Sequence, residues 1–393
     1  MISFRRFFVS SIMQTAFLFT LLLFFTLEHT NGFSLSPTPP LSSTGTIQTG
    51  EIWKWKGYDI YTVKSSISME PNSKPAILLI HGFGCSSVYW RETFSALVKE
   101  GFNVHAIDLL GQGKSSKPGR KDGIEYTIDL WAELVEDYAT QCILSSENNS
   151  LDEDGKGIVL MGNSLGSLVA LNAATGDYLR NSSKEGYISR YGRIRGICLF
   201  NCAVGLNSRN VVTEPNRTPL SRFYLTILLD ILDALIFKNI FLLTYLLKNV
   251  VTKDLLRDTL KSLYISSPDR VDDELVESFF APAKDQGSPE ALSQIYTNDA
   301  GRSPIEIHED PVGKLKLKGV PLQLVWGDKD GITPLAGGVG QFYTDLAKSD
   351  DSGCVKLGII KNCGHIPFDD CPEQSNDIVI QWLQENVLNK KHK

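Results

Sequence analysis

Short apolar runs alternate with longer amphipathic stretches from residue 51 onward. The short runs have the length of buried strands, whereas the stretches between them show helical spacing. Buried strands are predicted at residues 76–80, 103–107, 157–161, 194–200, 320–326 and 356–360, after an opening hairpin formed by IWKW and YDIYTV. Helices are predicted near residues 87–100, 126–144, 165–175 and 373–388. Strands that alternate with helices predict an α/β fold with a mostly parallel central sheet and helices on both of its faces.

A long insertion between the strands at 194–200 and 320–326 does not continue this alternation. Its centre, residues 223–251, is apolar almost all round but contains two aspartates and two lysines, which disfavour a bilayer span. We expect a helical cap over the carboxyl ends of the strands, where open α/β sheets bind ligands. Whether the cap lines a pocket or only packs against the core stays open. The predicted domains are a leader and linker (1–50), a core (51–205 and 313–393) and an inserted helical cap (206–312).

The first 50 residues form a separate segment. Arg5 and Arg6 precede an apolar run at residues 7–27, which has the composition of a signal peptide and approaches the roughly 20 residues that span a bilayer. A cleaved targeting segment and a retained membrane anchor are therefore the alternatives. Residues 33–50 are rich in serine, threonine and proline and carry no charge, so this linker cannot form a core.

A signal peptide followed by Phe33 and a hydroxyl-rich stretch without acidic residues resembles the two-part plastid leaders of algae with secondary plastids. This resemblance implies a plastid location, with a mature chain that begins near Phe33 or later. Plain secretion is the alternative, and Asn148, Asn181 and Asn216 in N-x-S/T triplets would then be candidate glycan sites. Two polar segments, residues 145–157 and 180–192, are predicted as surface loops.

Composition and charge argue against a nucleic-acid partner, a zinc site and a disulfide framework. The net charge of −6 and the absence of a basic stripe argue against a nucleic-acid partner. Seven cysteines at unrelated spacings, with no C-x-x-C, indicate neither a zinc site nor a disulfide framework. We expect no metal and no organic cofactor, and the sequence does not indicate an oligomeric state.

The segment MGNSLGS, residues 161–167, has the form G-x-S-x-G and lies between a predicted strand and a predicted helix. In this context the motif predicts a nucleophile elbow, a sharp turn that exposes the serine hydroxyl above the sheet. Gly162 and Gly166 supply the small residues that such a turn requires. Ser164 is therefore a candidate nucleophile, and the helix that follows directs its free N–H groups toward charge that develops beside the serine.

A serine hydroxyl needs a neighbouring base, and the base needs a carboxylate that fixes its tautomer. His365 in NCGHIPFDDCPE follows the last predicted strand directly, whereas the other histidines lie in the leader, the tail, a strand or other loops. The segment VWGDKDGITP offers Asp328 and Asp330 after an earlier strand. The glycine-rich HGFG at residues 81–84 can supply the N–H of Phe83, together with the N–H of Leu165, to a tetrahedral oxyanion.

With these motifs the chain resembles the α/β-hydrolase superfamily over residues 51–389. The segments LLIHGFGCSSVYWRETFSAL, VHAIDLLGQGKSSKP, GNSLGSLVALNAA, WGDKDGITP and CGHIPFDDCPE are most similar to plastid hydrolases that include chlorophyll dephytylase and pheophytinase. The resemblance implies an α/β-hydrolase fold, a triad of Ser164, Asp330 and His365, oxyanion donors at Phe83 and Leu165, and removal of phytol from chlorophyll pigments. Asp330 is preferred to Asp328 because family members place the acid three residues after the glycine at Gly327.

Two departures weaken the similarity to the plastid subgroup more than the similarity to the superfamily. Ser167 stands where relatives commonly have a second glycine, and polar insertions lie at 145–157 and 180–192. Similar epoxide hydrolases and haloalkane dehalogenases carry aspartate at the position of Ser164, so this serine argues against both. Three functions remain: an esterase for a long-chain ester such as a phytyl ester, a broader carboxylesterase, lipid acyl hydrolase or carbon–carbon bond hydrolase, and a non-enzymatic small-molecule receptor. The expected partners are a hydrophobic ester substrate and, peripherally, the thylakoid membrane.

Overall fold

The computed structural model describes residues 48–65, 74–144, 157–179, 193–207, 209, 212 and 218–389. The predicted leader, apart from its last three residues, lies outside the described residues. The two segments predicted as polar loops, apart from Gly157, and the asparagines of the three N-x-S/T triplets also lie outside them.

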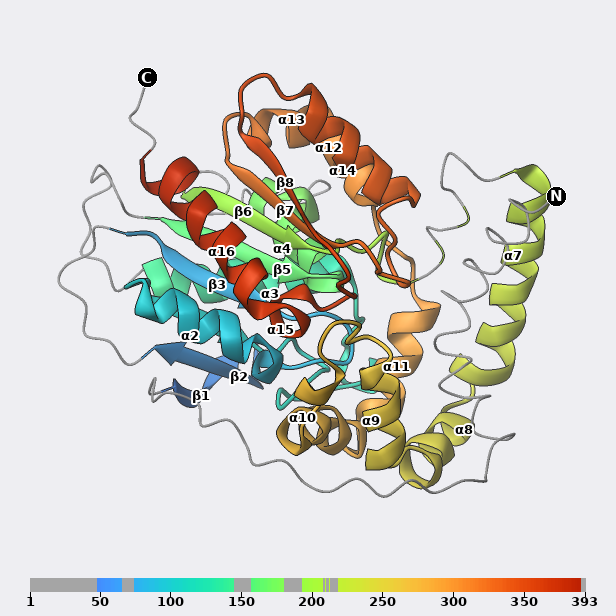
Figure 1. Ribbon diagram of the computed structural model, residues 1–393. Helices are drawn as coiled ribbons and strands as arrows, with labels where there is room; N and C mark the ends of the chain where they lie inside the picture. The colour runs from blue at the N-terminus through green and yellow to red at the C-terminus, as the bar shows by residue number, and fades with distance from the viewer. Residues whose placement is uncertain are drawn as a thin grey trace.

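An eight-stranded sheet forms the centre of the molecule, in the order β1-β2-β4-β3-β5-β6-β7-β8 (Figure 1). β2 is antiparallel to β1 and β4, and all other neighbours are parallel. The strands are β1 (Gln48–Trp55), β2 (Tyr58–Ser65), β3 (Ala76–Ile80), β4 (Val104–Ile107), β5 (Ile158–Asn163), β6 (Ile194–Phe200), β7 (Leu322–Gly327) and β8 (Val355–Ile360). The predicted hairpin is present, and a strand is present at each of the six predicted ranges, although β1 begins within the range assigned to the linker. The expected burial is wrong for β8, an edge strand in which only Ile360 is buried.

Helices cover both faces of the sheet, because successive side chains of the buried strands point to opposite faces. In β3, Leu78 and Ile80 join the apolar cluster under α3 and α4, whereas Ile77 and Leu79 join the cluster under α2 and α16. The core helices are α2 (Arg91–Lys99), α3 (Ile128–Tyr138), α4 (Leu165–Thr175), α14 (Gly338–Ser349), α15 (Pro367–Asp370) and α16 (Pro372–Trp382). This arrangement confirms the predicted fold class.

Helical turns extend three of these core helices to the lengths predicted from the sequence. The 3₁₀ turn η2 (Ser87–Trp90) precedes α2, and the π-helical segments η4 (Ala139–Leu144) and η9 (Leu383–Leu388) continue α3 and α16. The sequence did not predict α14, whose glycine-containing start, GVGQ, gives a weak helical signal.

The insertion between β6 and β7 forms a helical cap. Its helices are α7 (Pro219–Leu232), the π turn η6 (Asp233–Phe237), α8 (Ile240–Tyr245), the π turn η7 (Leu246–Val250), α9 (Lys253–Lys261), α10 (Asp273–Ala283) and α11 (Ser288–Thr297). Side chains of Thr218, Asn239, Thr252 and Asp272 cap the first turns of α7, α8, α9 and α10, which explains where these helices begin. In Figure 1, α7 lies at the edge of the molecule, far from the sheet.

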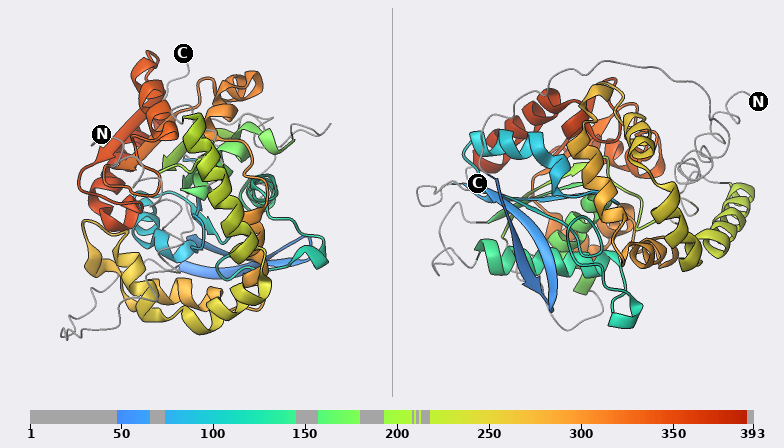
Figure 2. Two further views of the ribbon diagram at one scale, coloured as in Figure 1. Left: turned by 90° about the vertical axis from the view of Figure 1, so that its right-hand side faces the viewer. Right: turned by 90° about the horizontal axis from the view of Figure 1, so that it is seen from below.

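The chain returns to the core earlier than the predicted cap boundary at residue 312. The helix α12 (Pro304–Glu309) already packs against α4 and α14, and α13 (Pro311–Leu317) also packs against α4. Ile307 of α12 is fully buried in the core cluster. Seen from below, the cap helices lie mainly to one side of the sheet (Figure 2, right). Within the described ranges, no helix combines the length and apolarity that a membrane span requires.

Candidate active site

The chain turns sharply between β5 and α4, and Ser164 lies at the turn. Its backbone has φ 53° and ψ −119°, a strained conformation for a residue with a side chain. A Cβ at Gly162 would overlap the backbone of Gly166, and one at Gly166 would overlap the carbonyl groups at the end of β3. The two glycines of the motif are therefore sterically required, as the sequence analysis predicted.

His365 lies on the loop after β8, and its Nδ1 is 2.8 Å from Oδ2 of Asp330 on the loop after β7. Both side chains are buried. Because Asp330 accepts the Nδ1–H, the neutral ring leaves Nε2 free to act as a base. Ser164 and His365 line the same cavity, and no hydrogen bond joins Ser164 Oγ to the ring among the described residues.

Asp330 is held by a saturated set of hydrogen bonds. Its Oδ2 also accepts bonds from Asn201 Nδ2 at 2.5 Å and Thr333 Oγ1 at 2.7 Å, and its Oδ1 accepts the N–H groups of Ile332 and Thr333 at 2.7 and 3.1 Å. Burial alone would raise the pKa of Asp330, but the His365 ring and the hydrogen bonds from His365, Asn201 and Thr333 outweigh it. The net pKa is lower than the usual value.

Asp328 and the other described histidines have different surroundings. Asp328 accepts the N–H of Asn362 at 2.6 Å, and no hydrogen bond joins it to the His365 ring in the described part of the chain. His81 bonds the carbonyl of Gly82 and the N–H of Leu109, and burial lowers its pKa. Burial also lowers the pKa of His105 and of His308 to about 4, so both rings are neutral structural groups.

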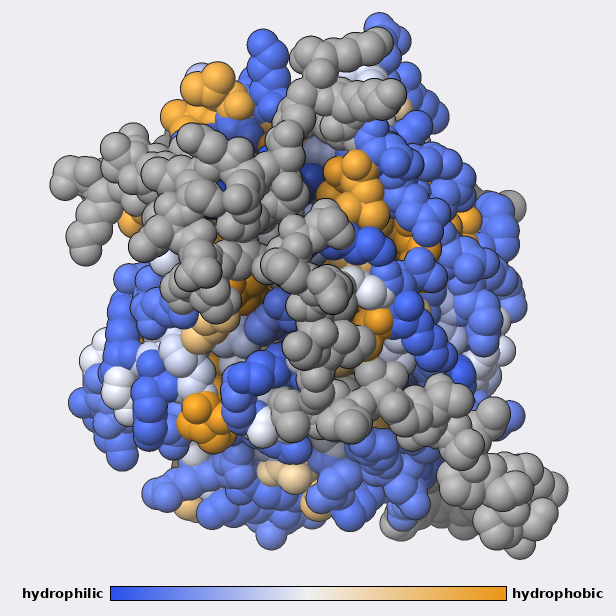
Figure 3. Space-filling view, turned by 90° about the vertical axis from the view of Figure 1, so that its left-hand side faces the viewer, coloured by the Kyte–Doolittle hydropathy of each residue, from blue (hydrophilic) through white to orange (hydrophobic). Residues whose placement is uncertain are grey.

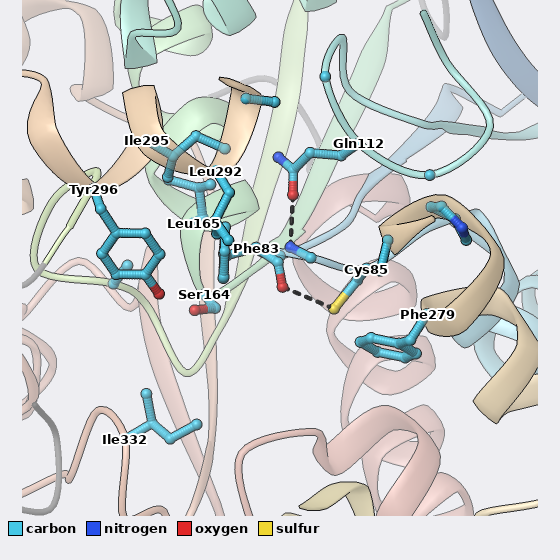
Figure 4. A pocket seen from close by; sticks show the side chains of 18 of the residues that line it. Phe83, Cys85, Gln112, Ser164, Leu165, Phe279, Leu292, Ile295, Tyr296 and Ile332 are labelled. Atoms are coloured by element: carbon cyan, nitrogen blue, oxygen red, sulfur yellow. Dashed lines mark hydrogen bonds between the residues drawn. The ribbon is translucent and has the colours of Figure 1, made fainter. Parts of the chain in front are cut away.

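In the HGFG loop, the backbone N–H groups on either side of the N–H of Phe83 already donate hydrogen bonds. The N–H of Gly82 donates to Tyr89 Oη at 2.5 Å, and the N–H of Gly84 donates to Gln112 Oε1 at 2.6 Å. Neither the N–H of Phe83 nor that of Leu165 donates a hydrogen bond to any group in the described part of the chain. Phe83 and Leu165 both line the cavity beside Ser164, so their two free donors are available to an oxyanion (Figure 4).

Asn163, the residue before the serine, connects three parts of the site. Its Oδ1 accepts a hydrogen bond from Tyr89 Oη at 3.0 Å, and its Nδ2 donates to the carbonyl groups of Phe200 and His365, both at 3.2 Å. Tyr89 in turn holds the HGFG loop. The side chain of Asn163 therefore connects three segments: the turn at Ser164 (the elbow), the HGFG loop at residues 81–84 (the oxyanion loop) and the loop after β8 that carries His365 (the histidine loop).

The histidine loop is also anchored after His365, where Asp369 lies in α15. Asp369 is fully buried and accepts hydrogen bonds from Arg91 Nε at 3.1 Å, Arg91 Nη2 at 3.2 Å and Tyr264 Oη at 2.6 Å. Arg270 Nε donates to the Asp369 carbonyl at 2.7 Å. Because Tyr264 and Arg270 belong to the cap, this carboxylate fastens the cap to the histidine loop.

Cys363, Asp370 and Cys371 form a buried cluster whose side-chain ligand atoms lie within 4.8 Å of one another. The Asp370 carboxylate already accepts N–H groups of residues 265–267 and of Gly364, at 2.8 to 3.3 Å. A carboxylate with this many backbone donors fits a structural anchor better than a metal ligand. The expectation that the chain holds no metal stays a prediction.

An apolar cavity of about 380 Å³ lies above Ser164. Its polar lining residues include Ser164, His365, Asn163 and Thr333, together with Gln112, Lys117, Asn207, Thr259 and Ser288. The apolar lining comes mainly from the cap: Leu247, Val251, Leu256, Leu260, Leu263, Phe279, Leu292, Ile295 and Tyr296. Figure 4 shows Leu292, Ile295 and Tyr296 on the same side of the pocket as Leu165.

The cavity answers the question that the sequence left open about the cap. From the stretch 223–251, only Leu247 and Val251 line the cavity. Leu232, Phe237 and Leu243 instead form a small cluster against Leu292 and Tyr296. The cap therefore lines the pocket, mainly with residues after 251, whereas the buried apolar side chains of 223–251 pack against other cap residues.

Comparisons with known proteins show which family the chain resembles. A model of the alpha/beta hydrolase family matches residues 77–378. The chain is 22% identical over 396 aligned residues to bifunctional epoxide hydrolase 2 of Sus scrofa, with 92% of this chain and 60% of that protein covered. The chain thus spans less than two thirds of that relative.

Two solved structures are similar in fold. One is a membrane phospholipase A described as a novel bacterial virulence factor, with a TM-score of 0.55, 19% identity and 87% of each chain covered. The other is a meta-cleavage product hydrolase from Pseudomonas fluorescens IP01, with a TM-score of 0.52, 18% identity and coverage of 84% of this chain and 95% of that one. These similarities confirm the α/β-hydrolase fold.

Proposed function

We propose that this chain, which belongs to the alpha/beta hydrolase family, is a serine hydrolase that cleaves a carboxylic ester through an acyl-enzyme on Ser164. The observation that carries this proposal is the Asp330–His365 hydrogen bond, 2.8 Å long, on the loops beside a strained serine. Two unpaired N–H groups in the same cavity support it. Such an arrangement contains every component that acyl transfer requires.

The proposed reaction follows from these positions. Ser164 Oγ attacks the ester carbonyl while His365 Nε2 takes its proton, and Asp330 stabilises the imidazolium that forms. The N–H groups of Phe83 and Leu165 donate to the oxyanion of the tetrahedral intermediate. His365 then gives the proton to the leaving alcohol, and a water molecule activated by the same ring hydrolyses the acyl-enzyme.

We further propose that the substrate is a long-chain apolar ester, with the phytyl ester of chlorophyll or pheophytin as the specific candidate. Each buried methylene contributes about 0.8 kcal/mol, so an apolar wall rewards a long chain. The cavity of about 380 Å³ is near the lower end of the roughly 300–1,000 Å³ of small-molecule pockets. It suits an alkyl chain, and a pigment macrocycle would remain at its mouth.

The other candidate functions differ in whether they would use Ser164, Asp330 and His365 for a reaction. A lipid acyl hydrolase or a carbon–carbon bond hydrolase would use the same triad. The epoxide hydrolases that the sequence resembles carry aspartate where this chain has Ser164, which argues against epoxide opening. A receptor would bind the ligand in the cavity without turnover.

Purified chain should be incubated with chlorophyll a, pheophytin a, phospholipid and short p-nitrophenyl esters, and the products followed by chromatography. Dephytylated pigment that the Ser164→Ala variant does not form would support the phytyl ester. Cleavage of short esters or lipid without pigment product would leave the general hydrolase. Binding without any turnover would favour the receptor.

We also propose that the leader is removed and that the mature protein resides in the plastid. The support is the sequence of residues 1–50 alone, with its apolar run and its uncharged linker. Mass spectrometry of the native N-terminus tests the proposal. Peptides from before Thr30 in the mature protein would indicate a retained anchor instead.

A further inference from the structure

Large apolar side chains are exposed on the cap segment that contains α7, η6 and α8. Of the fourteen exposed large hydrophobic residues in the described part of the chain, nine lie between residues 220 and 245. They are Leu220, Phe223, Tyr224, Ile227, Ile231, Leu235, Ile240, Phe241 and Tyr245, and together they are called the α7–α8 apolar face. Soluble monomers rarely expose so many large apolar groups in one place.

The spacing of these residues shows that they form a stripe rather than scattered positions. From Leu220 to Leu235 they recur at intervals of three and four residues, which places them on one side of α7 and its continuation η6. The opposite side is already packed, because Leu232 and Phe237 are buried and the Phe237 ring stacks on Tyr296 at 4.1 Å. The exposed stripe therefore does not serve the packing of the cap.

The charges on this segment favour an anionic partner. Its two acidic residues, Asp230 and Asp233, are both paired with Arg209. Lys238 and Lys248 are exposed and form no ion pair within the described ranges. The segment therefore presents free positive charge, although the whole chain has a net charge of −6.

Four of the nine residues are aromatic, and Phe241 is 86% exposed. Phenylalanine and tyrosine beside lysine are typical of helices that lie in the plane of a membrane interface. The face is also continuous with the cavity wall, because α8 runs directly into η7, and Leu247 and Val251 line the cavity. By contrast, the described surface on the side of the molecule away from α7 is mainly hydrophilic, with small separate apolar spots (Figure 3).

We propose that the α7–α8 apolar face docks on the surface of an anionic lipid bilayer, with α7 and α8 lying in the interface rather than crossing it. Phe223, Leu235 and Phe241 insert among the acyl chains, while Lys238 and Lys248 meet anionic headgroups. This docking stands independently of the chemistry at Ser164. It would bring a membrane-dissolved ester next to the cap wall of the cavity.

The test uses the full chain and a tryptophan placed on the face, Phe241→Trp, with vesicles that contain brominated phosphatidylcholine and phosphatidylglycerol. The control is Leu315→Trp on α13, a residue that is also exposed, at 70%. The six native tryptophans are present in both variants, so quenching of the unaltered chain gives the background. Bromine quenches tryptophan only at close range, so a bilayer that receives the face should add quenching in Phe241→Trp and not in Leu315→Trp. This readout is specific to the face even if the leader also binds the vesicles.

Replacing Lys238 and Lys248 with glutamine in the Phe241→Trp chain should raise the concentration of anionic lipid needed for half-maximal quenching by about 30-fold, the loss of about 1 kcal/mol for each lysine near such a surface. Equal quenching at positions 241 and 315 would overturn the proposal. It would also be overturned if fluorescence at position 241 changed with protein concentration and not with vesicles, because a second copy would then cover the face. Hydrolysis of a soluble ester, measured on the same samples, reports on Ser164 separately.

Discussion

In the loops that carry Ser164, Asp330 and His365, many hydrogen bonds hold the polar side chains, whereas the outer cap helices α7 and α8 leave large apolar side chains exposed. Asp330 accepts five hydrogen bonds, and Asp370 behind the histidine loop accepts the N–H groups of four residues. The outer helices instead leave nine large apolar side chains in solvent.

This difference reflects two requirements: reacting groups need fixed positions, and a surface that binds a fluid partner needs exposed groups. Reacting groups must be held within a fraction of an ångström, and a saturated set of hydrogen bonds provides that rigidity. A surface that meets a fluid partner needs no such fixed geometry, and it carries its binding groups at the cost of exposure. The four predictions that follow test this contrast, beginning with the largest expected effect.

Ser164→Ala and His365→Ala should each abolish turnover and labelling by a fluorophosphonate probe. Residues of a triad act as a unit, and loss of the nucleophile or base in a comparable triad costs on the order of 10⁶-fold in kcat. Gel fluorescence after probe treatment measures the labelling. Labelling that persists in Ser164→Ala would mean that another residue is the nucleophile.

Asp330→Asn should lower kcat by about 10⁴-fold, because an asparagine favours the wrong tautomer of His365. Asp328→Asn is the matched control, since Asp328 bonds Asn362 and not the ring. The ratio of the two kcat values on one ester measures the difference. A larger loss in Asp328→Asn would show that the hydrogen bond from His365 to Asp330 does not orient the catalytic ring.

Much of the site could be predicted because its residues follow strands that have clear apolar patterns. Ser164, Asp330, His365 and Phe83 each occupy a loop directly after β5, β7, β8 or β3. Parallel strands bring such loops to one edge of the sheet, so their proximity follows from the topology. The glycines that flank Ser164 gave a further local signal.

The residues that hold this site in place were not predicted. Asn201 and Thr333 support Asp330, and Asn163 links the elbow to the histidine loop. An asparagine after a strand gives no signal that distinguishes a hydrogen bond to a distant carboxylate from an ordinary turn. Asp369 and Asp370 lay within the motif quoted for His365, but most of their partners, Arg91 in the core and Tyr264 and Ser266 in the cap among them, are far away in sequence.

The cap was predicted as a helical segment, yet its inner and outer sides could not be assigned. Residues 223–251 are apolar on nearly all sides, so their periodicity does not say which side faces the pocket. The structure shows that a few of these side chains line the cavity, some form a small cluster, and many are exposed.

The stability of the folded chain should fall as the pH drops below about 4, and Asp330 should contribute to that fall. Its pKa in the folded chain lies below the usual 3.8. A lowered pKa stabilises the fold above the unfolded pKa, and this contribution is lost as the pH falls through the folded value. Chemical denaturation between pH 7 and pH 3 measures it. Asp330→Asn should lose less stability than the unaltered chain over this range, and an equal loss would show that the carboxylate is not stabilised.

The smallest effect is expected on the outer side of the cap. Leu235→Ser should change the free energy of unfolding by no more than about 0.5 kcal/mol, because a side chain that is 64% exposed contributes little to packing. Leu243→Ala is the comparison on the inner side, where a buried leucine costs roughly 2–5 kcal/mol on truncation. Denaturant unfolding of both variants gives the two values. If Leu235→Ser were as destabilising as Leu243→Ala, the exposed stripe would belong to the packing of the fold, and the contrast between a fixed site and a free apolar face would fail. If it is not, the exposed stripe contributes little to the stability of the fold, and its side chains remain free to dock on a bilayer.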